Sequence, residues 1–221
     1  MGDLAERVAR LRSRIRTACE DAGRDPGGVE LLPVSKRQPI ALLEEARKLG
    51  FTRFGENYVQ EGVRKAGLVP GVDFLLIGPL QRNKAKAALG HFREILTVDR
   101  PGLAERLRRL AEEEDLVRPV WIQLELWEEA SKEGGCSEAE LPAVVEALGG
   151  DPRLPLQGFM AIPPPELGSA FTDVARLRES WQQRLGHRLR LSMGMSGDLE
   201  EAIAAGSDQV RLGTAFFGDR E

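Results

Sequence analysis

A lysine stands directly after the first β-rich apolar run of the sequence, residues 31–36 (LLPVSK). Alternation along a strand places Leu32, Val34 and Lys36 on one face. If that face lines a barrel, Lys36 lies at the mouth, where a partly desolvated neutral amine can attack a carbonyl and form a Schiff base. The alternative is a solvent-exposed lysine just past a strand end, which this strand alone favours because most lysines are exposed.

The last β-rich run, residues 209–214 (QVRLGT), supplies groups that suit an anion. Alternation turns Val210 and Leu212 toward the helices and Arg211 inward, and a buried arginine is costly unless an anion or polar ring satisfies it. Gly213 lets a ligand approach the backbone, and Thr214 adds a hydroxyl donor beside exposed amide groups.

A second loop of small residues, 192–198 (SMGMSGD), precedes a helix predicted to begin near Leu199. Ser196 and the neighbouring amides can cap that helix and bind an anion at its positive end. Capping alone is the alternative, and the two roles are compatible. A lysine, an inward arginine and two hydroxyl-bearing loops together predict a site for a phosphorylated aldehyde held as an imine.

These residues need a scaffold of alternating strands and helices, and the hydrophobic pattern predicts one. The predicted strands span residues 29–35, 52–55, 74–77, 94–98, 119–126, 156–161, 188–192 and 209–213. The predicted helices between them span residues 39–49, 56–66, 81–89, 101–114, 137–148, 167–185 and 198–205. Such alternation implies right-handed crossovers and a parallel sheet.

Eight parallel strands can form an open doubly wound sheet or a closed (β/α)8 barrel. The first strand lacks a following GxGxxG and the chain lacks GxxxxGK[ST], which removes the main support for a nucleotide-binding open sheet. We therefore predict a single α/β domain over residues 1–221, with an N-terminal helix at 1–24 and a TIM-type barrel core at 29–214. In such barrels the site lies at the carboxyl ends of the strands, and phosphate is held after strands seven and eight.

The N-terminal helix is predicted from one apolar stripe and many arginines on its other faces. The stripe consists of Leu4, Val8, Leu11, Ile15 and Ala18. A basic amphipathic helix can bind a membrane surface or act as a transit peptide, but acidic residues dilute that signal. We expect this helix to pack on the barrel with a solvated basic face.

Composition excludes several classes of protein. The 221 residues carry 31 Lys and Arg against 35 Asp and Glu, so the net charge of −4 offers no electrostatic reason to expect nucleic-acid binding. No apolar run is long enough to span a bilayer. Cys19 and Cys136 form no CxxC pair, which argues against a zinc site or disulfide framework. We expect a cytoplasmic monomer with no metal, membrane or nucleic-acid partner.

Six motifs, in order along nearly the whole chain, resemble those of the pyridoxal 5′-phosphate (PLP) homeostasis proteins. They are residues 34–36 (VSK), 54–61 (FGENYVQE), 77–84 (IGPLQRNK), 158–163 (GFMAIP), 191–196 (LSMGMS) and 210–218 (VRLGTAFFG). The resemblance implies the barrel of the alanine racemase N-terminal domain, with PLP bound to Lys36 as a Schiff base. It also implies that Arg211 faces the pyridine nitrogen, that Asn57 lies near the cofactor, and that the phosphate is held by Ser196, Gly213 and Thr214.

The chain departs from the family pattern in two places. Residues 74–76 (FLL) replace a Trp-His-Phe found in many members, which puts in doubt any role for a histidine there. Gly197 replaces an acid that often follows the serine of the strand-seven loop, which could loosen that loop.

The resemblance implies PLP binding and vitamin B6 homeostasis with little or no catalysis. An arginine at the pyridine nitrogen keeps that nitrogen unprotonated and weakens the ring as an electron sink. Racemases with such an arginine use the lysine and a tyrosine from a second domain and a partner subunit, whereas this chain has Tyr58 alone and no room for that domain. His91 and His187 are expected to be structural or exposed.

Two alternatives stay open. The first is a weak PLP-dependent racemase or lyase with Lys36 as its base, which would need a second proton-transfer group. The second is a class I aldolase-type barrel, which is weaker because its lysine usually follows a later strand. Transient contact with PLP-dependent apo-enzymes is a family-level expectation that no residue indicates.

Overall fold

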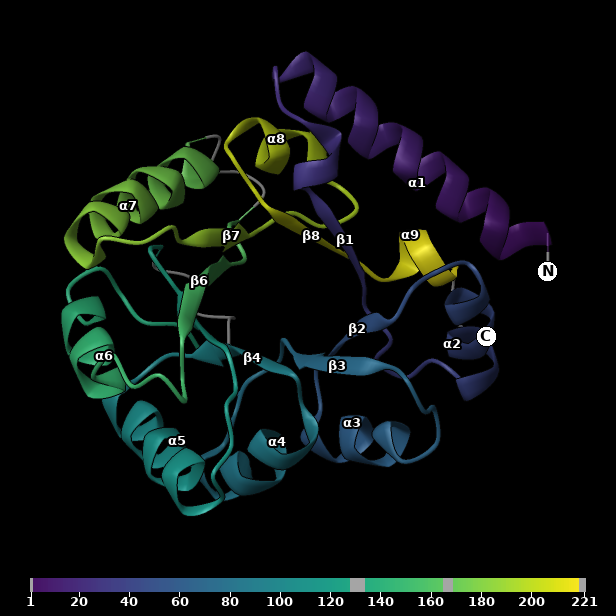
Figure 1. The fold of residues 1–221 in the computed structure, drawn as a ribbon. Helices are drawn as coiled ribbons and strands as arrows, with labels where there is room; N and C mark the ends of the chain where they lie inside the picture. The colour runs from purple at the N-terminus through teal and green to yellow at the C-terminus, as the bar shows by residue number, and fades with distance from the viewer. Residues whose placement is uncertain (1, 128–133, 165–168, 219–221) are drawn as a thin grey trace.

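Eight parallel strands form one sheet that curls into a nearly closed barrel, as predicted (Figure 1). The computed structural model describes residues 2–127, 134–164 and 169–218. The strands are β1 (Glu30–Pro33), β2 (Arg53–Glu56), β3 (Asp73–Leu76), β4 (Glu94–Val98), β5 (Val120–Leu124), β6 (Leu156–Ala161), β7 (Arg190–Ser192) and β8 (Gln209–Leu212). Their order in the sheet is β1-β8-β7-β6-β5-β4-β3-β2. A parallel bridge between Val34 and Gly55 links the two outermost strands, β1 and β2.

Helices surround the barrel and leave its carboxyl end to the loops (Figure 1). The α-helices are α1 (Gly2–Asp21), α2 (Ile40–Lys48), α3 (Val59–Ala66), α4 (Ala85–His91), α5 (Pro101–Glu113), α6 (Leu141–Leu148), α7 (Ala170–Leu185), α8 (Leu199–Ala204) and α9 (Thr214–Phe217). Two 3-10 turns, η1 (Pro26–Gly28) and η2 (Arg82–Lys84), complete the elements. Among the described helices, none is long and apolar enough to cross a membrane.

The predicted elements are present, with shifts at their ends. β4 and β6 have the predicted bounds, and the other strands are offset or shorter. α3 begins at Val59 rather than 56 because Glu56 still pairs in the sheet. α6 begins at Leu141 rather than 137 because the Glu140 carboxylate accepts hydrogen bonds from the Ser137 amide and hydroxyl, which form a turn. The predicted start of the helix at 167 lies outside the described residues. α9 was not predicted.

Left-handed glycines end two of the helices that cover the sheet. Gly149 follows α6 with φ 64°, and Gly186 follows α7 with φ 72°. Other residues adopt this conformation at a cost, so glycine is favoured where the chain turns back toward the next strand.

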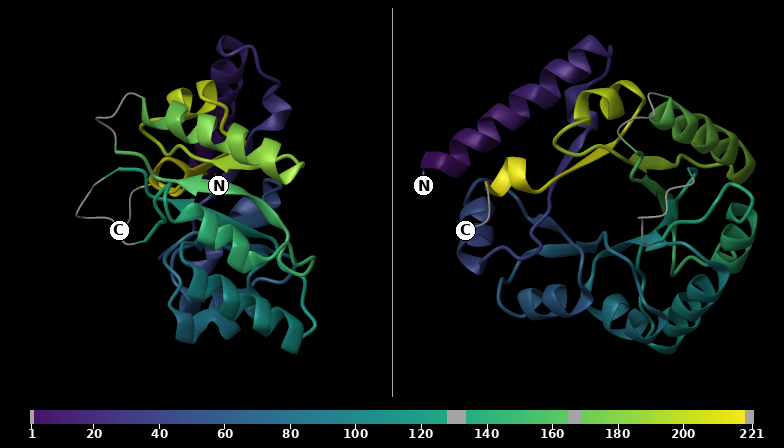
Figure 2. Two further views of the ribbon diagram at one scale, coloured as in Figure 1. Left: turned by 90° about the vertical axis from the view of Figure 1, so that its left-hand side faces the viewer. Right: turned by 180° about the vertical axis from the view of Figure 1, so that it is seen from behind.

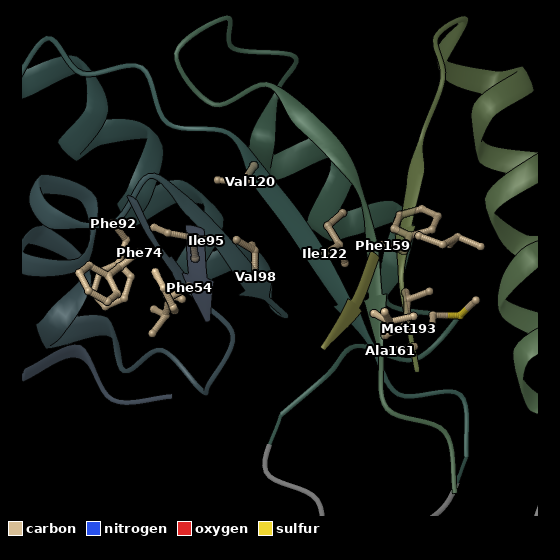
Figure 3. Close-up of a cluster of buried hydrophobic side chains, with 14 of the residues drawn as sticks. Phe54, Phe74, Phe92, Ile95, Val98, Val120, Ile122, Phe159, Ala161 and Met193 are labelled. Carbon is tan, nitrogen blue, oxygen red and sulfur yellow. The ribbon is translucent and has the colours of Figure 1, made fainter. Parts of the chain in front are cut away.

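The apolar core has two layers that follow the alternation of the strands. Side chains on the outer face of the sheet pack beneath the helices, among them Phe54, Phe74, Ile122 and Phe159 (Figure 3). A smaller cluster fills the inside of the barrel and consists of Leu32, Val34, Leu75, Ile77, Leu96, Trp121 and Met160. Since Leu32 and Val34 belong to the inner layer, and Val210 and Leu212 to the outer one, the predicted faces of β1 and β8 are confirmed.

The apolar stripe of α1 is buried against the barrel, as predicted. α1 lies beside α8 and α9 in both the front and rear views (Figures 1 and 2). The expectation of a solvated basic face is wrong for Arg7, whose guanidinium group is largely covered and bonds to the body of the protein. Arg14 bonds to the body of the protein as well but stays half-exposed.

Candidate functional site

A cavity of about 270 Å³ opens at the carboxyl end of the barrel. Its lining contains all six residues that the sequence singled out: Lys36, Asn57, Ser196, Arg211, Gly213 and Thr214. The remaining lining residues are Val34, Ile77, Ile162 and Met195. Residues as far apart in the chain as Lys36 and Thr214 therefore meet in one place, because parallel strands bring their carboxyl ends to the same edge.

Lys36 lies at the turn that leaves β1 and is half-buried. Within the part of the chain that the structure describes, its amine has no hydrogen bond or ion pair. The next residue, Arg37, has a φ of 59°, a left-handed conformation that costs a non-glycine residue about 1 kcal/mol or more. Backbone strain beside an unpaired amine is the pattern expected where geometry serves a ligand rather than stability.

A buried ion-pair cluster between β2 and α3 holds the backbone on both sides of Lys36. The Lys65 ammonium donates to the Ser35 carbonyl at 2.5 Å and contacts Glu56 at 2.7 Å and Glu61 at 2.8 Å. Glu61 also accepts a hydrogen bond of 2.6 Å from the Arg37 amide. The residues before and after Lys36 are thus tied to the same ammonium.

Sequence reasoning missed this cluster. Glu56 and Lys65 are both 0% exposed, and the Ser35 hydroxyl donates to the same Glu56 oxygen that Lys65 contacts, at 2.6 Å. Burial raises the pKa of the Glu56 carboxyl, while the hydrogen bonds from Lys65 and Ser35 act to lower it. The available signal was Glu56 itself, a charge on the outward, helix-facing side of β2.

Arg211 projects from β8 into the barrel and is only 4% exposed. One terminal nitrogen donates to the Ser192 carbonyl at 2.6 Å and to the Ser192 hydroxyl at 2.8 Å, and the other donates to the Ala161 carbonyl at 2.9 Å. Burial lowers the pKa of Arg211 to about 10, and the Asp198 carboxylate opposes that change. The guanidinium is therefore still a cation at neutral pH, held by neutral acceptors.

Two loops bring hydroxyl groups and a glycine to the cavity. Ser196 follows β7 and is half-buried, whereas Thr214 follows β8 and is exposed. The expected capping role of Ser196 is wrong: the residue before α8 is Asp198, and its carboxylate accepts from the Met195 amide at 2.5 Å instead of capping the helix. The Ser196 hydroxyl is thus not used as the cap of α8.

Gly213 leaves room in the cavity that a side chain would fill. Its φ of −98° is open to any residue, and an added Cβ would meet only Val34 atoms at 3.8 and 3.9 Å, an ordinary contact distance. Neither the sign of φ nor a clash with the protein demands glycine here. The cavity that Gly213 lines is therefore what a side chain would occupy.

An orphaned polar atom completes the site. Asn57 Oδ1 is buried without a hydrogen-bond partner, which costs free energy unless a ligand supplies a donor. An unpaired amine, a buried cation, two hydroxyls and an unsatisfied amide oxygen form a set of groups that fits a phosphorylated aldehyde.

Groups for general acid or base catalysis are sparse around this cavity. His91 and His187 are exposed, as expected, and neither lines the cavity. Tyr58 is 46% exposed, and its hydroxyl lies 3.5 Å from a terminal nitrogen of Arg37 rather than in the lining. A search of the described residues finds no cluster of side chains suited to a metal ion.

Known proteins resemble this chain over its full length. The family described as "Alanine racemase, N-terminal domain" matches residues 7–221. A pyridoxal phosphate homeostasis protein of Pseudomonas aeruginosa is 42% identical over 228 residues, which cover 100% of this chain and 97% of that protein.

Solved structures agree with the fold. PipY of Synechococcus elongatus with PLP bound has a TM-score of 0.85 and 35% identity, over 98% of this chain and 100% of that one. An alanine racemase of Clostridium difficile has a TM-score of 0.78 with 12% identity, over 100% of this chain and 57% of that one. The racemase has the same barrel fold, and the rest of the racemase chain lies outside the match.

Proposed function

We propose, on the premise that the chain belongs to the pyridoxal phosphate homeostasis protein family, that it binds PLP as a Schiff base to Lys36 and takes part in vitamin B6 homeostasis. The observation that carries this proposal is one cavity in which an unpaired lysine amine meets a buried arginine and an orphaned amide oxygen. The PLP-bound relative supports the same ligand.

The residues divide the work of binding. PLP supplies an aldehyde that an amine captures reversibly. Lys36 provides the amine, Arg211 lies at the pyridine nitrogen, and Asn57 accepts a hydrogen bond from the ligand. The residues that hold the phosphate are Ser196, Gly213 and Thr214.

We propose little or no catalysis. The Arg211 cation keeps the ring nitrogen unprotonated and so disfavours chemistry that needs the ring to accept electrons. Apart from Lys36, the described lining of the cavity contains no carboxylate, histidine or tyrosine to move a proton. A weak racemase or lyase with Lys36 as its base is the alternative.

We propose further that residues 1–221 form a single domain that acts as a cytoplasmic monomer. Two buried, unpaired cysteines suit a reducing compartment. The large apolar side chains exposed among the described residues lie in four different loops, which offers no continuous patch for a partner: Tyr58, Leu68, Val117 and Met195. Contact with apo-enzymes extends the family's role, and no residue here indicates it.

The test is to purify the chain, add PLP, and record the visible absorbance of lysine-bound PLP together with alanine racemisation. We expect a visible band in the wild type, no band in Lys36→Ala, and no measurable turnover. A wild type that stays colourless and takes up no PLP contradicts the proposal. Robust turnover lost in Lys36→Ala favours the enzyme instead.

A further inference from the structure

The N-terminal helix lies across both loops to which we assign the phosphate. α8 follows the loop that contains Ser196, and α9 follows Gly213. α1 packs against both helices on the outside of the barrel (Figures 1 and 2). A depression at this junction is lined by Arg7, Arg14, Ser196 and Thr214, so it shares Ser196 and Thr214 with the cofactor cavity.

Arg14 bonds to the Ser196 loop at two points. Its Nε donates to Glu200 Oε1 at 2.7 Å and one terminal nitrogen donates to Glu200 Oε2 at 2.8 Å, a bidentate pair with the first turn of α8. Both terminal nitrogens also reach the Ser196 carbonyl, at 3.2 and 3.3 Å. The pair raises the pKa of Arg14 and lowers the pKa of Glu200, so both stay charged at neutral pH.

The bond to the carbonyl sets the direction of a peptide group. In a trans peptide the C=O and the following N–H point opposite ways. With the Ser196 carbonyl turned toward Arg14, the Gly197 amide is directed away from α1. This matters here because Gly197 has no side chain to hold the loop itself.

Arg7 plays the same part for the second loop. Its Nε and one terminal nitrogen donate to the Phe216 and Phe217 carbonyls at 3.1 Å each, and it pairs with Asp3. The amides of Phe216 and Phe217 in turn donate to the Gly213 carbonyl at 2.9 Å. α9 is thereby held between Arg7 at one end and Gly213 at the other.

We propose that Arg14 and Arg7 are positioning residues through which α1 clamps the two loops in the conformation that binds a phosphate ester. The inference rests on the proposed function and deepens it. Because binding and clamping share the same loops, PLP must stabilise the docked α1 to the same extent that docked α1 favours PLP.

Arg14 is the residue to change, because its side chain is half-exposed and the Arg14→Ala protein should still fold. We would titrate wild type and Arg14→Ala with PLP and with pyridoxal, which has the aldehyde but no phosphate. We expect the PLP affinity of Arg14→Ala to fall roughly three- to fivefold, the upper range for one exposed bidentate pair, with pyridoxal affinity within about twofold of wild type.

Two further variants sharpen the result. Arg16→Ala is the matched control, because Arg16 is an exposed arginine of the same helix whose only bond among the described residues is to the Ser13 hydroxyl within α1. We expect it to match wild type with both ligands. Arg14→Lys keeps a charged donor but lacks the planar guanidinium that contacts both Glu200 oxygens, so it should recover part of the PLP affinity.

Hydrogen–deuterium exchange gives a readout independent of affinity. We expect faster exchange at residues 193–199 in Arg14→Ala, with PLP slowing exchange in α1 of the wild type. Unchanged PLP affinity, or equal losses for PLP and pyridoxal, would overturn the clamp while wild-type binding at Lys36 stood. A wild type that binds neither ligand would instead overturn the proposed function and, with it, the clamp.

Discussion

The two ends of the barrel interior differ in whether their polar side chains find partners within the protein. At the amino end, Glu30 pairs with Arg53 at 3.1 Å and with Arg190 at 3.3 Å, and accepts from the Gln209 amide at 2.9 Å. Arg53 also pairs with Glu94 at 2.5 Å. Two carboxylates and two guanidinium groups therefore form a neutral ion-pair network.

Each carboxylate oxygen of this ion-pair network is bonded. Trp121 Nε1 donates to the second oxygen of Glu94 at 2.8 Å, and the Arg190 guanidinium lies 5.4 Å from the Trp121 ring. Both oxygens of Glu30 are likewise bonded. The amino end thus closes the barrel with charges that satisfy one another.

At the carboxyl end the cavity combines a hydrogen-bonded Arg211 with two polar groups that are left unpaired. The Lys36 amine has no partner within the described residues, and Asn57 Oδ1 is an orphan. The contrast teaches how to separate stability from function in this fold: satisfied polar groups close one end, and unsatisfied ones mark the site at the other.

The largest contrast should come from Lys36→Ala. This change removes covalent PLP binding completely, yet it should alter the free energy of unfolding by less than about 0.5 kcal/mol because no bond inside the protein is lost. Urea denaturation of the PLP-free protein, monitored by circular dichroism, measures the second quantity. A loss of more than about 2 kcal/mol would mean that Lys36 supports the fold.

Glu94→Gln, at the amino end, should lower the stability of the protein without changing its PLP affinity. The glutamine amide cannot accept from both Arg53 and Trp121, so a buried donor is left unsatisfied and stability should fall by about 2 kcal/mol. PLP affinity of the folded protein should stay within twofold of wild type.

Asn57→Ala is the matched control for Glu94→Gln. It removes a polar group whose Oδ1 has no partner, so it should cost less than about 1 kcal/mol of stability while weakening PLP binding. If Asn57→Ala destabilised the protein as much as Glu94→Gln, the contrast between the two ends would be wrong.

Gly213→Ala tests whether space, rather than backbone conformation, explains that glycine. The methyl group fits against Val34, so folding should be preserved, but it enters the cavity and should weaken PLP binding about tenfold, or ~1.4 kcal/mol. Gly194→Ala is the control, because Gly194 has a φ of 93° and its Cβ would meet Ala202 at 2.7 Å. That variant should lose stability instead.

The smallest effect concerns the exposed Arg14–Glu200 pair at the rim of the site. Arg14 lowers the pKa of Glu200, so the stability from this pair is present at neutral pH and disappears as pH falls through the folded-state pKa, below the ordinary value of 4.5. The difference in unfolding free energy between wild type and Glu200→Gln should be about 0.5 kcal/mol at pH 7 and low salt. The difference should approach zero once the pH is below that folded-state pKa, and a difference that grew as the pH fell would contradict the prediction.

Much of the site followed from the sequence because strand alternation is local. The alternation of side chains along β1 and β8 predicted that Lys36 and Arg211 face inward. The order of strands and helices predicted a parallel sheet, in which the carboxyl ends of these strands lie at the same edge. The six motifs added Asn57, whose orphaned oxygen no periodicity could reveal.

The rest depends on contacts between elements. Lys65 looks like any surface lysine of a helix, and only the packing of α3 against β2 buries it beside Glu56. The basic face of α1 was equally ambiguous, because amphipathicity cannot say which arginines meet carbonyls on a neighbouring helix. α9, with four residues, is too short for any periodic pattern.

The central claim is that the carboxyl end of the barrel holds PLP through one lysine. The most direct test is to incubate the full chain with PLP, reduce it with borohydride, and locate the modified residue by peptide mass spectrometry. The account predicts one modification per chain, on Lys36, with none in Lys36→Ala. Modification spread over the chain's other lysines, or equal labelling of the variant, would contradict it.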